Sequence, residues 1–443
     1  MPKELLKQLL AENPSQLYAL FADTMPADLA DALASLSDEE LLQLLPHISP
    51  DMLAVVVQEF DEAQAKRLLS LVSTELALEI IGAMSPDDAV DMLNWLPDDL
   101  SERIMNAMPV DSPLHDLISY EEESSGSIMT TEFLTVRPEW TVDKALQVIR
   151  TEAEHAETIY YTYVIDRRGR LVGVLSLRDL VLAHPNTQVS SIMRSNPVRV
   201  TDDEDQEQVA ALFRRYDLVA LPVVDEHGVL KGIVTSDDII DVVDEEATED
   251  IQRMAAMQPS DTPYLSTPIL KLASQRFGWL LILMVSATFT GQIMRRYEEM
   301  LAQVVFLAVF IPMLMDTGGN AGSQSSTLVI RGLALGDIKV KDWWRVIARE
   351  FSVSSLVGVA LAVVNFARII LIEKYPADVA LVVSLTLVVT IILAKIVGGI
   401  LPILAQLVNI DPAIMAGPLI TTIVDALALI AYFSIAGAVL GVY

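Results

Sequence analysis

The stretch DPAIMAGPLITTIVDALALIAYF, residues 411–433, decides the class of this 443-residue chain. It is apolar and, with the residues after it, reaches the length of about 20 residues that a helix needs to cross a bilayer. One carboxylate, Asp425, interrupts it. Fourteen residues separate Asp411 from Asp425, which places Asp425 about 20 Å along a helix. An ionised acid at the bilayer centre costs about 2.5 kcal/mol or more, so Asp425 is expected to face a cavity and to serve ions or protons.

Four further apolar segments come before the last one, so the C-terminal part of the chain is predicted to cross the membrane repeatedly. The candidate spans are 277–294, 299–317, 350–372, 379–408 and 412–442. The connection between the second and third spans carries Arg331, Lys339, Lys341, Arg345 and Arg349. By the positive-inside rule this connection is cytoplasmic. The N-terminal part is then cytoplasmic as well, and the C-terminus lies outside.

A second polar interruption, PMLMDTGGNAGSQSSTLVIRG at residues 312–332, lies at the cytoplasmic end of the second span. Its small residues suit close packing of helices, because they let two backbones approach. Its amides and hydroxyls, Asn320 among them, suit the lining of an aqueous cavity, and their density favours a pore. Lys395 in the fourth span is interpreted as the other charge in the membrane. Pairing with an acid, snorkelling and projection toward the interface all remain open for it.

The polar groups that precede Asp425 offer oxygen atoms. Thr421 and Thr422 lie one turn before it, and Gly417 and Pro418 lie one turn earlier, where proline frees a backbone carbonyl. Oxygen ligands without nitrogen or sulfur suit a hard cation such as Mg²⁺, Ca²⁺ or Mn²⁺. One carboxylate with carbonyls and hydroxyls cannot strip the water from a small divalent ion. It can hold a hydrated ion, the form that Mg²⁺ prefers to keep.

Residues 127–247 contain one pattern twice. Each copy runs from a short extended segment through a helix, a strand, a polar turn and a strand to another helix, and the hairpins read VIDRRGRLVGVLS and VVDEHGVLKGIVT. The closing segments GVLSLRDL and GIVTSDDI resemble those of tandem CBS domains, which often bind adenine nucleotides, so ATP is the candidate ligand of this cleft. The resemblance places four residues at a nucleotide ribose: Ser176, Asp179, Thr235 and Asp238. The alternative is that these residues only cap helices.

Residues 25–108 repeat every 12 residues, in units such as SDEELLQLLPHI and SPDDAVDMLNWL. Most units open with Ser, Pro or Asp and further acids, and continue with Leu, Ile, Val or Met. This order marks a helix start, because a side-chain oxygen caps free amides and acids suit the N-terminal end of the helix dipole. Each unit is too short to bury a core alone, so the stacked units are predicted to form a helical superhelix without strands.

Charge divides the chain into two halves. Residues 1–270 hold 50 acidic and 18 basic side chains, net −32, and residues 271–443 hold 10 and 12, net +2. Nucleic-acid binding is not expected, because it needs a cationic face. The acidic half serves either solubility or the collection of cations. Cysteine is absent, which excludes disulfides and thiolate sites, and no Walker loop, Ser–His–Asp order or histidine pair is present, so an enzyme is not expected.

The order of acidic helical repeats, CBS pair, connecting helix and five spans resembles the MgtE family of magnesium channels over essentially the whole chain. The patterns TGGNAGSQSSTLVIRGL and DPxxxxGPxxTTxxDxxxLxxYF carry this resemblance. It implies a multidomain membrane protein with an all-α superhelical repeat domain, an α/β tandem CBS pair, a connecting helix and a five-helix α transmembrane domain. The expected bounds are 1–126 for the N domain, 127–247 for the CBS pair, 248–270 for the connecting helix and linker, and 271–443 for the transmembrane domain.

The resemblance also implies a homodimer in the plasma membrane with one central pore, closed when cytosolic Mg²⁺ binds the N and CBS domains. The implied pore residues are Asp425, Asn320, Thr421, Ala416 and Gly417. The implied gating acids are Glu59, Asp91, Asp241, Asp244, Glu249, Asp250 and Asp411. Closure on binding of Mg²⁺ agrees with the net charge of −32 on residues 1–270. Divalent cations screen the repulsion within this acidic half and so stabilise a compact arrangement of its domains.

Two other functions stay open beside a Mg²⁺-selective channel. One is a proton- or sodium-coupled exporter of divalent cations such as Mg²⁺, Mn²⁺ or Co²⁺, regulated by nucleotide at the CBS pair, in which Asp425 cycles protons. The other is a membrane-tethered nucleotide sensor without transport. Flux that follows only the gradient of the ion itself argues against the exporter, and any cation flux argues against the sensor.

Overall fold

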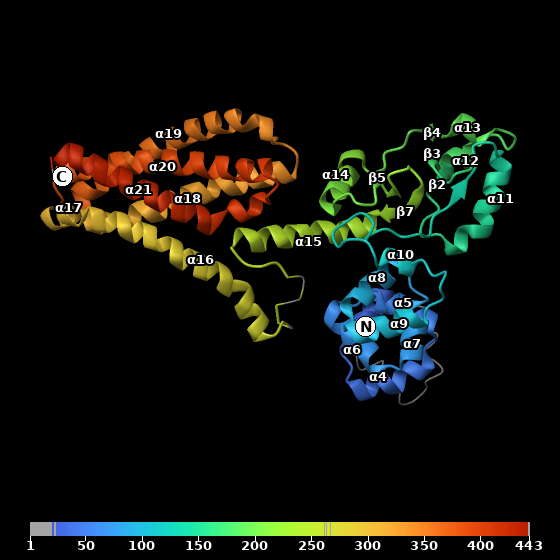
Figure 1. Cartoon of the computed structure of the whole chain (residues 1–443). Helices are drawn as coiled ribbons and strands as arrows, with labels where there is room; N and C mark the ends of the chain where they lie inside the picture. Colours follow the sequence, from blue (N-terminus) through green and yellow to red (C-terminus); the bar gives the residue numbers. More distant parts are fainter. Residues whose placement is uncertain (1–19, 22–23, 261, 263, 266, 442–443) are drawn as a thin grey trace. The chain divides into compact units, whose positions relative to one another are not determined.

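The computed structural model describes residues 20–21, 24–260, 262, 264–265 and 267–441. The chain divides into two compact units, residues 1–244 and 245–443 (Figure 1). The first unit contains the repeat region and the CBS pair, and the second contains the long apolar helices. Each unit has its own core, so each is described separately.

The repeat region forms one helix for each 12-residue unit, as the sequence predicted. Ser37, Ser49, Asp61 and Ser73 each cap the following helix by accepting a hydrogen bond from a backbone N–H. Leucines and other apolar residues of successive helices share one core. The helices are α3 (Pro26–Ala34), α4 (Asp38–Leu44) with the 3₁₀ turn η1 (Leu45–His47), α5 (Pro50–Val57), α6 (Glu62–Leu71), α7 (Thr74–Ile81), α8 (Pro86–Trp95), α9 (Asp98–Ala107) and the short α10 (Leu114–Leu117).

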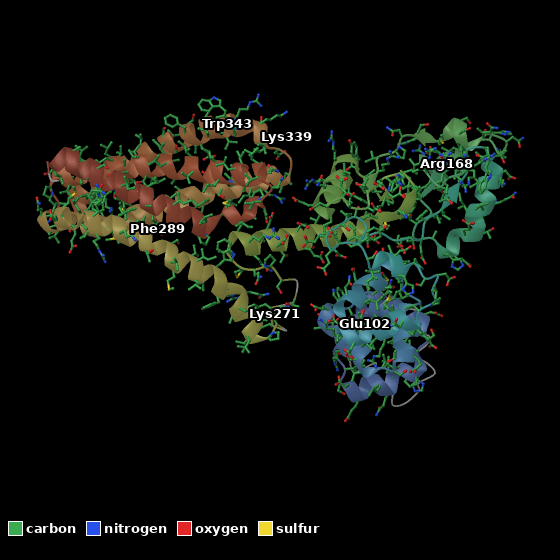
Figure 2. All side chains as sticks on the ribbon, in the orientation of Figure 1. Glu102, Arg168, Lys271, Phe289, Lys339 and Trp343 are labelled. Atoms are coloured by element: carbon green, nitrogen blue, oxygen red, sulfur yellow. The ribbon has the colours of Figure 1, made fainter. Side chains whose placement is uncertain are left out.

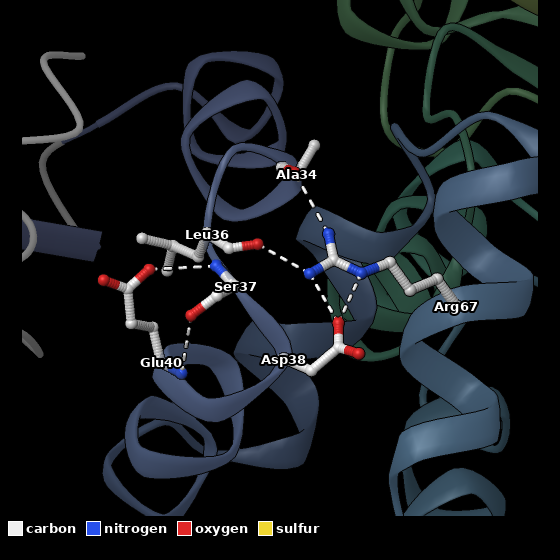
Figure 3. A network of polar contacts seen from close by, with 6 residues as sticks. All are labelled: Ala34, Leu36, Ser37, Asp38, Glu40 and Arg67. Carbon is white, nitrogen blue, oxygen red and sulfur yellow. Dashed lines mark hydrogen bonds and ion pairs between the residues drawn. The ribbon is translucent and has the colours of Figure 1, made fainter.

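Arg67 of α6 ties the first repeats together (Figure 3). Its guanidinium donates to the carbonyls of Ala34 and Leu36 at 3.1 and 2.6 Å, and to Asp38 Oδ1 at 2.7 Å. These bonds satisfy free carbonyls at the end of α3, where a cation also suits the helix dipole. Beside it, Ser37 and Glu40 form a reciprocal capping box at the start of α4. One basic side chain therefore fixes the spacing of three helices in an acidic domain.

The duplicated pattern folds into two small sheets. The first has the order β1-β2-β3-β4 and the second β5-β6-β7, each with a parallel first pair and an antiparallel hairpin. The strands are β1 (Thr135–Val136), β2 (Tyr161–Ile165), β3 (Leu171–Ser176), β4 (Arg194–Ser195), β5 (Val200–Thr201), β6 (Ala220–Val224) and β7 (Leu230–Thr235). The helices are α11 (Val142–Glu152), the 3₁₀ turn η2 (Ala153–His155), α12 (Leu177–Leu182), α13 (Val189–Ile192) and α14 (Gln206–Tyr216).

The two copies interlock through their backbones. Thr130, in the opening segment of the first copy, exchanges hydrogen bonds of 2.8 and 2.9 Å with Ile233 in β7 of the second copy. The two hairpin turns also pair, since Leu171 N–H donates to Gly228 O and Leu230 N–H donates to Gly169 O. The copies therefore form one structure rather than two independent modules. After β7 the chain continues into α15 (Ser236–Met254), whose last turns belong to the second unit.

Five long helices dominate the described part of the second unit: α16 (Ile269–Arg296), α18 (Phe306–Ala334), α19 (Trp343–Arg368), α20 (Ala377–Leu407) and α21 (Gly417–Leu440). Short segments join them: α17 (Glu298–Gln303), the 3₁₀ turns η3 (Val340–Asp342) and η5 (Pro412–Met415), and a π-helical turn, η4 (Ile369–Glu373). Helices α18, α20 and α21 pack into one apolar core. The buried Tyr432 hydroxyl of α21 donates to Leu307 O of α18 at 3.0 Å.

Four of these helices, together with their flanking turns, are long and apolar enough to cross a membrane. They are α16, η3–α19–η4, α20 and η5–α21. The fifth, α18, has 29 residues but is more polar, because it contains the glycine- and amide-rich segment. The single second span expected over 299–317 is wrong in its bounds, since the helix breaks after Gln303 and restarts at Phe306. The described residues therefore hold a membrane unit in which one helix is unusually polar.

Candidate functional site

The glycines of α18 serve close packing. A Cβ on Gly318 would lie 2.7 Å from Thr390 Cγ2, one on Gly319 would lie 2.8 Å from Thr421 Cγ2, and one on Gly322 would lie 2.6 Å from Ile420 Cγ2. These distances are shorter than carbon contacts of about 3.5 to 4.0 Å allow. The glycines therefore bring α18 against α20 and α21. Close packing of helices is one of the two roles that the sequence suggested for this glycine-rich segment.

The exposed face of α18 carries polar side chains instead. Asp316 and Asn320 are both exposed and lie four residues apart, so they project from the same side of the helix. Within the described part of the chain, neither makes a hydrogen bond or an ion pair. Packing thus accounts for the glycine face of the helix, and pore lining stays a prediction for the exposed polar face.

Asp425 lies half-buried in the third turn of α21. It makes no hydrogen bond or ion pair with the residues that the structure describes, but its charge interacts with that of Asp316. Two uncompensated carboxylates from different helices thus share one region of the membrane unit. Sequence reasoning missed Asp316, which stands in the same quoted segment as Asn320 and precedes it by one helical turn.

The backbone before α21 is irregular at the expected pore residues. Ala416 is extended, with φ −95° and ψ −172°, and Gly417 has φ +25°, a region that side chains disfavour. A Cβ on Gly417 would also lie 2.8 Å from Met254 O of α15. The hydroxyls of Thr421 and Thr422 both donate to Pro418 O, at 2.9 and 3.0 Å. The oxygen of Thr421 keeps lone pairs that can accept from water.

The sequence left open whether Lys395 pairs with an acid, snorkels or projects toward the interface. The structure buries Lys395 between helices. Its Nζ lies 3.3 Å from Ser325 Oγ and 3.5 Å from Gln324 Oε1 of α18. Ser325 Oγ in turn donates to Glu350 Oε2 of α19 at 2.6 Å. A hydroxyl therefore bridges a lysine and a glutamate, and the network joins α18, α19 and α20.

The end of α15 contacts the segment before α21 within the second unit. Arg253 forms ion pairs with Glu249 of its own helix and with Asp411. Met254 packs on Ile330, Ala413 and Ala416. Burial, reinforced by the Asp411 charge, raises the pKa of Asp250. Three expected gating acids, Glu249, Asp250 and Asp411, thus gather around one arginine.

An acidic cluster forms in the first unit between α8, the CBS pair and the start of α15. Asp87 is 8% exposed, and its Oδ1 has no hydrogen-bond partner among the described residues. Burial and the charges of Asp238 and Asp88 raise the pKa of Asp87 to about 8. Burial and neighbouring carboxylates also raise the pKa of Glu157 to about 7 and that of Asp238 to about 6. Such groups favour bound protons or a cation.

The remaining expected gating acids are spread over the first unit. Asp241 belongs to the acidic cluster, because Asp88, Asp237 and Asp244 add to the effect of burial in raising its pKa. Glu59, Asp91 and Asp244 are exposed. In the part of the chain that the structure describes, no three Asp, Glu or His side chains converge as a ready-made metal chelate. The cluster therefore suits a cation that keeps its waters.

A cleft of about 430 Å³ opens in the CBS pair, lined by Tyr160, Tyr161, Ser176, Leu177, Arg178, Val181 and Val219. Ser176 and Asp179 form a reciprocal capping box at α12, and Thr235 donates to Asp238 Oδ2 at 2.5 Å. Of the four residues expected at a nucleotide, Ser176 lines this cleft, whereas Asp238 lies in the acidic cluster. The cap role is thus shown for Ser176 in the first copy, whereas in the second copy Asp238 accepts hydrogen bonds from the backbone and side chain of Thr235.

These features define a class of protein: an integral membrane cation transporter that carries a helical repeat domain and a CBS pair. The chain belongs to the MgtE family. The family model described as "Divalent cation transporter" matches residues 311–435, the MgtE intracellular N domain matches 24–123, and CBS domains match 126–186 and 189–245. The predicted family, fold class and non-enzymatic function are confirmed by these matches and by the relatives below.

Two relatives and one solved structure illustrate the similarity. The magnesium transporter MgtE of Thermus thermophilus is 43% identical over 320 residues, 72% of this chain and 71% of that protein. The magnesium transporter MgtE of Bacillus subtilis is 41% identical over 322 residues, 73% and 71% of the two chains. The crystal structure of the soluble part of a magnesium transporter is 34% identical and covers 55% of this chain and 98% of that chain, with a TM-score of 0.54.

Proposed function

We propose that this chain is a Mg²⁺ channel that carries the hydrated ion past Asp425 through the centre of a homodimer in the plasma membrane. The observation that carries the proposal is the pair of uncompensated carboxylates, Asp425 and Asp316, in a family described as divalent cation transporters. Asn320, Thr421 and the backbone at Ala416 and Gly417 supply further oxygens. They suit water-mediated contacts, because Mg²⁺ gives up its waters reluctantly.

Cytosolic Mg²⁺ is proposed to close this channel. The unpartnered Asp87 oxygen and the carboxylates around it support this, because a cation would offset their repulsion. At the other end of α15, Glu249, Asp250 and Asp411 surround Arg253 beside the expected pore entrance. A cation bound at either place would favour one arrangement of α15 over another, which is all that gating requires. The N-terminal domains are cytoplasmic and the C-terminus lies outside in this proposal.

ATP is proposed as the ligand of the CBS cleft. Tyr160 and Tyr161 offer aromatic faces for a base, and Arg178 offers a guanidinium that matches phosphate. ATP binding to the full-length protein, measured by calorimetry, is expected to weaken in Arg178→Ala and to be unchanged in Arg103→Ala, an exposed arginine of α9 in the repeat region. Equal binding by both variants would remove Arg178 from the site.

A coupled exporter of divalent cations is the second candidate. Asp425 favours it, because a half-buried carboxylate within a membrane span can carry protons. Full-length protein in proteoliposomes separates the two functions, with Mg²⁺ entry followed by a trapped dye. A channel gives flux that follows the Mg²⁺ gradient and membrane potential and is unchanged by a pH or Na⁺ gradient. Uphill Mg²⁺ movement driven by either gradient would establish the exporter.

A further inference from the structure

A basic and aromatic patch covers the start of α19. Trp343 and Trp344 are 49% and 65% exposed. Four cations stand around them, all exposed: Lys339, Lys341, Arg345 and Arg349. Figure 2 shows Trp343 and Lys339 at this end of α19, with their side chains pointing away from the helices. Residues 339–349 hold these four basic side chains and one acid, so the patch has a net charge of +3.

One acid organises the patch. Asp342 accepts a hydrogen bond of 3.2 Å from Lys339 N–H through Oδ2 and one of 3.2 Å from Arg345 Nη1 through Oδ1. It therefore holds the lysine-bearing turn against the first turn of α19. The side chain of Arg345 stays 86% exposed despite this bond, so most of its donors remain free for another partner. Lys341, Arg345 and Arg349 are spaced by four residues, which aligns the two arginines on one face of α19.

The patch continues directly into an apolar surface. Beyond it, α19 exposes Leu356, Val363 and Val364, which are 76%, 65% and 66% exposed. This helix is one of those long and apolar enough to span a membrane. The patch thus stands where the span meets water, the depth at which Trp is enriched and phosphate groups of lipids lie. Guanidinium groups match phosphate oxygens by paired hydrogen bonds.

The patch also connects to the polar segment of α18. Arg349 is followed by Glu350, whose Oε2 accepts a hydrogen bond from Ser325. Ser325 lies five residues after Asn320 and contacts Lys395. The turn of α19 that carries the last cation of the patch is therefore the turn that holds α18.

We propose that this patch binds the headgroups of anionic phospholipids and that bound lipid supports transport by fixing α19 through the Glu350–Ser325 contact. The lipid-binding part of this proposal, its binding half, depends on the patch alone. The part that concerns transport, its transport half, rests on the proposed function. The occupant is a lipid rather than a free anion, because the cations and the tryptophans lie together at the end of an apolar span.

The test compares the full-length protein with two variants of equal charge change. The first variant, the patch variant, replaces Lys339, Lys341, Arg345 and Arg349 with Gln. The control replaces the exposed Arg167, Arg168, Arg214 and Arg215 of the first unit with Gln. Native mass spectrometry counts phosphatidylglycerol retained by each protein. Each Lys or Arg near an anionic surface strengthens binding about fivefold, so the patch variant is expected to lose retained lipid at least tenfold and the control to keep it.

Two further arms make the test decisive. Arg345→Lys with Arg349→Lys is expected to retain lipid, since the charges remain, which separates binding from a folding defect. Inorganic phosphate is expected not to displace the lipid. Equal retention by the patch variant and the control, or displacement by phosphate, would overturn the binding proposal.

Mg²⁺ flux is then compared in phosphatidylcholine vesicles with and without phosphatidylglycerol. Wild-type flux that does not respond to phosphatidylglycerol would overturn the transport half and leave the Mg²⁺ channel itself untouched.

Discussion

At the residue scale, the membrane unit is defined by charges that the protein leaves uncompensated. Some other charges of that unit are paired, as with Arg253 between Glu249 and Asp411. Asp425 and Asp316 have no such partner in the described residues. Because an unpaired carboxylate in a membrane is costly, these two require water or a cation beside them. We interpret them as the cation-attracting part of the pathway.

Asp316→Asn tests the residue that the structure adds to the site. The substitution keeps the size of the side chain and removes one of the two interacting charges, so attraction for a divalent cation falls. Mg²⁺ flux in proteoliposomes is expected to drop by about tenfold, the effect of losing about 1.4 kcal/mol. Asp337→Asn, an exposed acid in the α18–α19 connection, is the matched control. Equal flux in the two variants would exclude Asp316 from the pathway.

The buried acids of the first unit predict a dependence of stability on pH. The pKa of Asp87 is raised to about 8 and that of Glu157 to about 7, so the folded unit binds protons that the unfolded chain releases. Stability is therefore greatest below the unfolded pKa near 4 and falls as pH rises toward 8. Without Mg²⁺, resistance of the full-length protein to limited proteolysis should rise several-fold from pH 8 to pH 6.

Mg²⁺ supplies the control for this pH effect. A bound cation replaces the protons, so saturating Mg²⁺ should give the same protection at pH 8 as low pH gives without it. Asp87→Asn should raise protection at pH 8 and flatten the pH dependence. The claim that protons or Mg²⁺ stabilise the acidic cluster would be contradicted by either of two results. One is protection from proteolysis that increases with pH, and the other is protection at pH 8 that does not change when Mg²⁺ is added.

At the element scale, α18 is a helix with two different faces. Its glycines bring it against α20 and α21, and the closest approach involves Gly398 of α20. A Cβ there would lie 2.2 Å from Gly322 O. Asp316 and Asn320 lie on another, exposed face of the same helix. Close packing on one side thus holds the polar side chains in place on the other.

Gly398→Ala tests this packing. The added methyl group meets a backbone carbonyl that cannot rotate away, so the free energy of unfolding should fall by about 1–3 kcal/mol. Gly278→Ala on α16 is the control, because nothing lies within 4 Å of its Cβ position and alanine favours a helix. Thermal unfolding in detergent should show a lower midpoint for the first variant alone. A midpoint equal to that of the wild type would show that the helices separate readily.

The sequence predicted elements well where the signal was local. Caps such as Ser37 and Asp61 marked the repeat helices, and the isolated acid in an apolar run singled out Asp425 as a pore candidate, which stays a prediction. It failed where the outcome depended on neighbours in space. Asp87 reads as an ordinary acid of a helix start, and only packing against the CBS pair buries it. Asp316 reads as one more polar residue, and only the rotation of α18 relative to α21 brings its charge near Asp425.

At the scale of the whole molecule, α15 is the covalent link between an acid-rich unit and a membrane unit. Its first turns carry Asp237, Asp238 and Asp241 of the acidic cluster, and its last turns carry Arg253 and Met254 beside η5 and α21. Both of these ends belong to one helix of 19 residues. Cation binding in the first unit is thereby expected to act on the segment before α21.

Arg253→Ala tests the contact at the membrane end of this link. Loss of the ion pair with Asp411 should release the last turn of α15, so under the proposed gating more Mg²⁺ should be needed to stop flux. The concentration for half-maximal inhibition of flux is expected to rise several-fold, while maximal flux is kept. Lys271→Ala, an exposed cation at the start of α16, should leave the inhibition curve unchanged. Identical curves for the two variants would mean that Arg253 only stabilises the fold.

The most direct test of the central claim is Mg²⁺ flux through full-length Asp425→Ala in proteoliposomes. The thermal unfolding midpoint and oligomeric state must match those of the wild type, so that a folding defect is not mistaken for a lost pathway. Flux should fall to the background of empty vesicles, because no other described acid of α21 replaces this carboxylate. Flux equal to that of the wild type would show that Mg²⁺ does not pass Asp425, and the proposed pathway would be wrong.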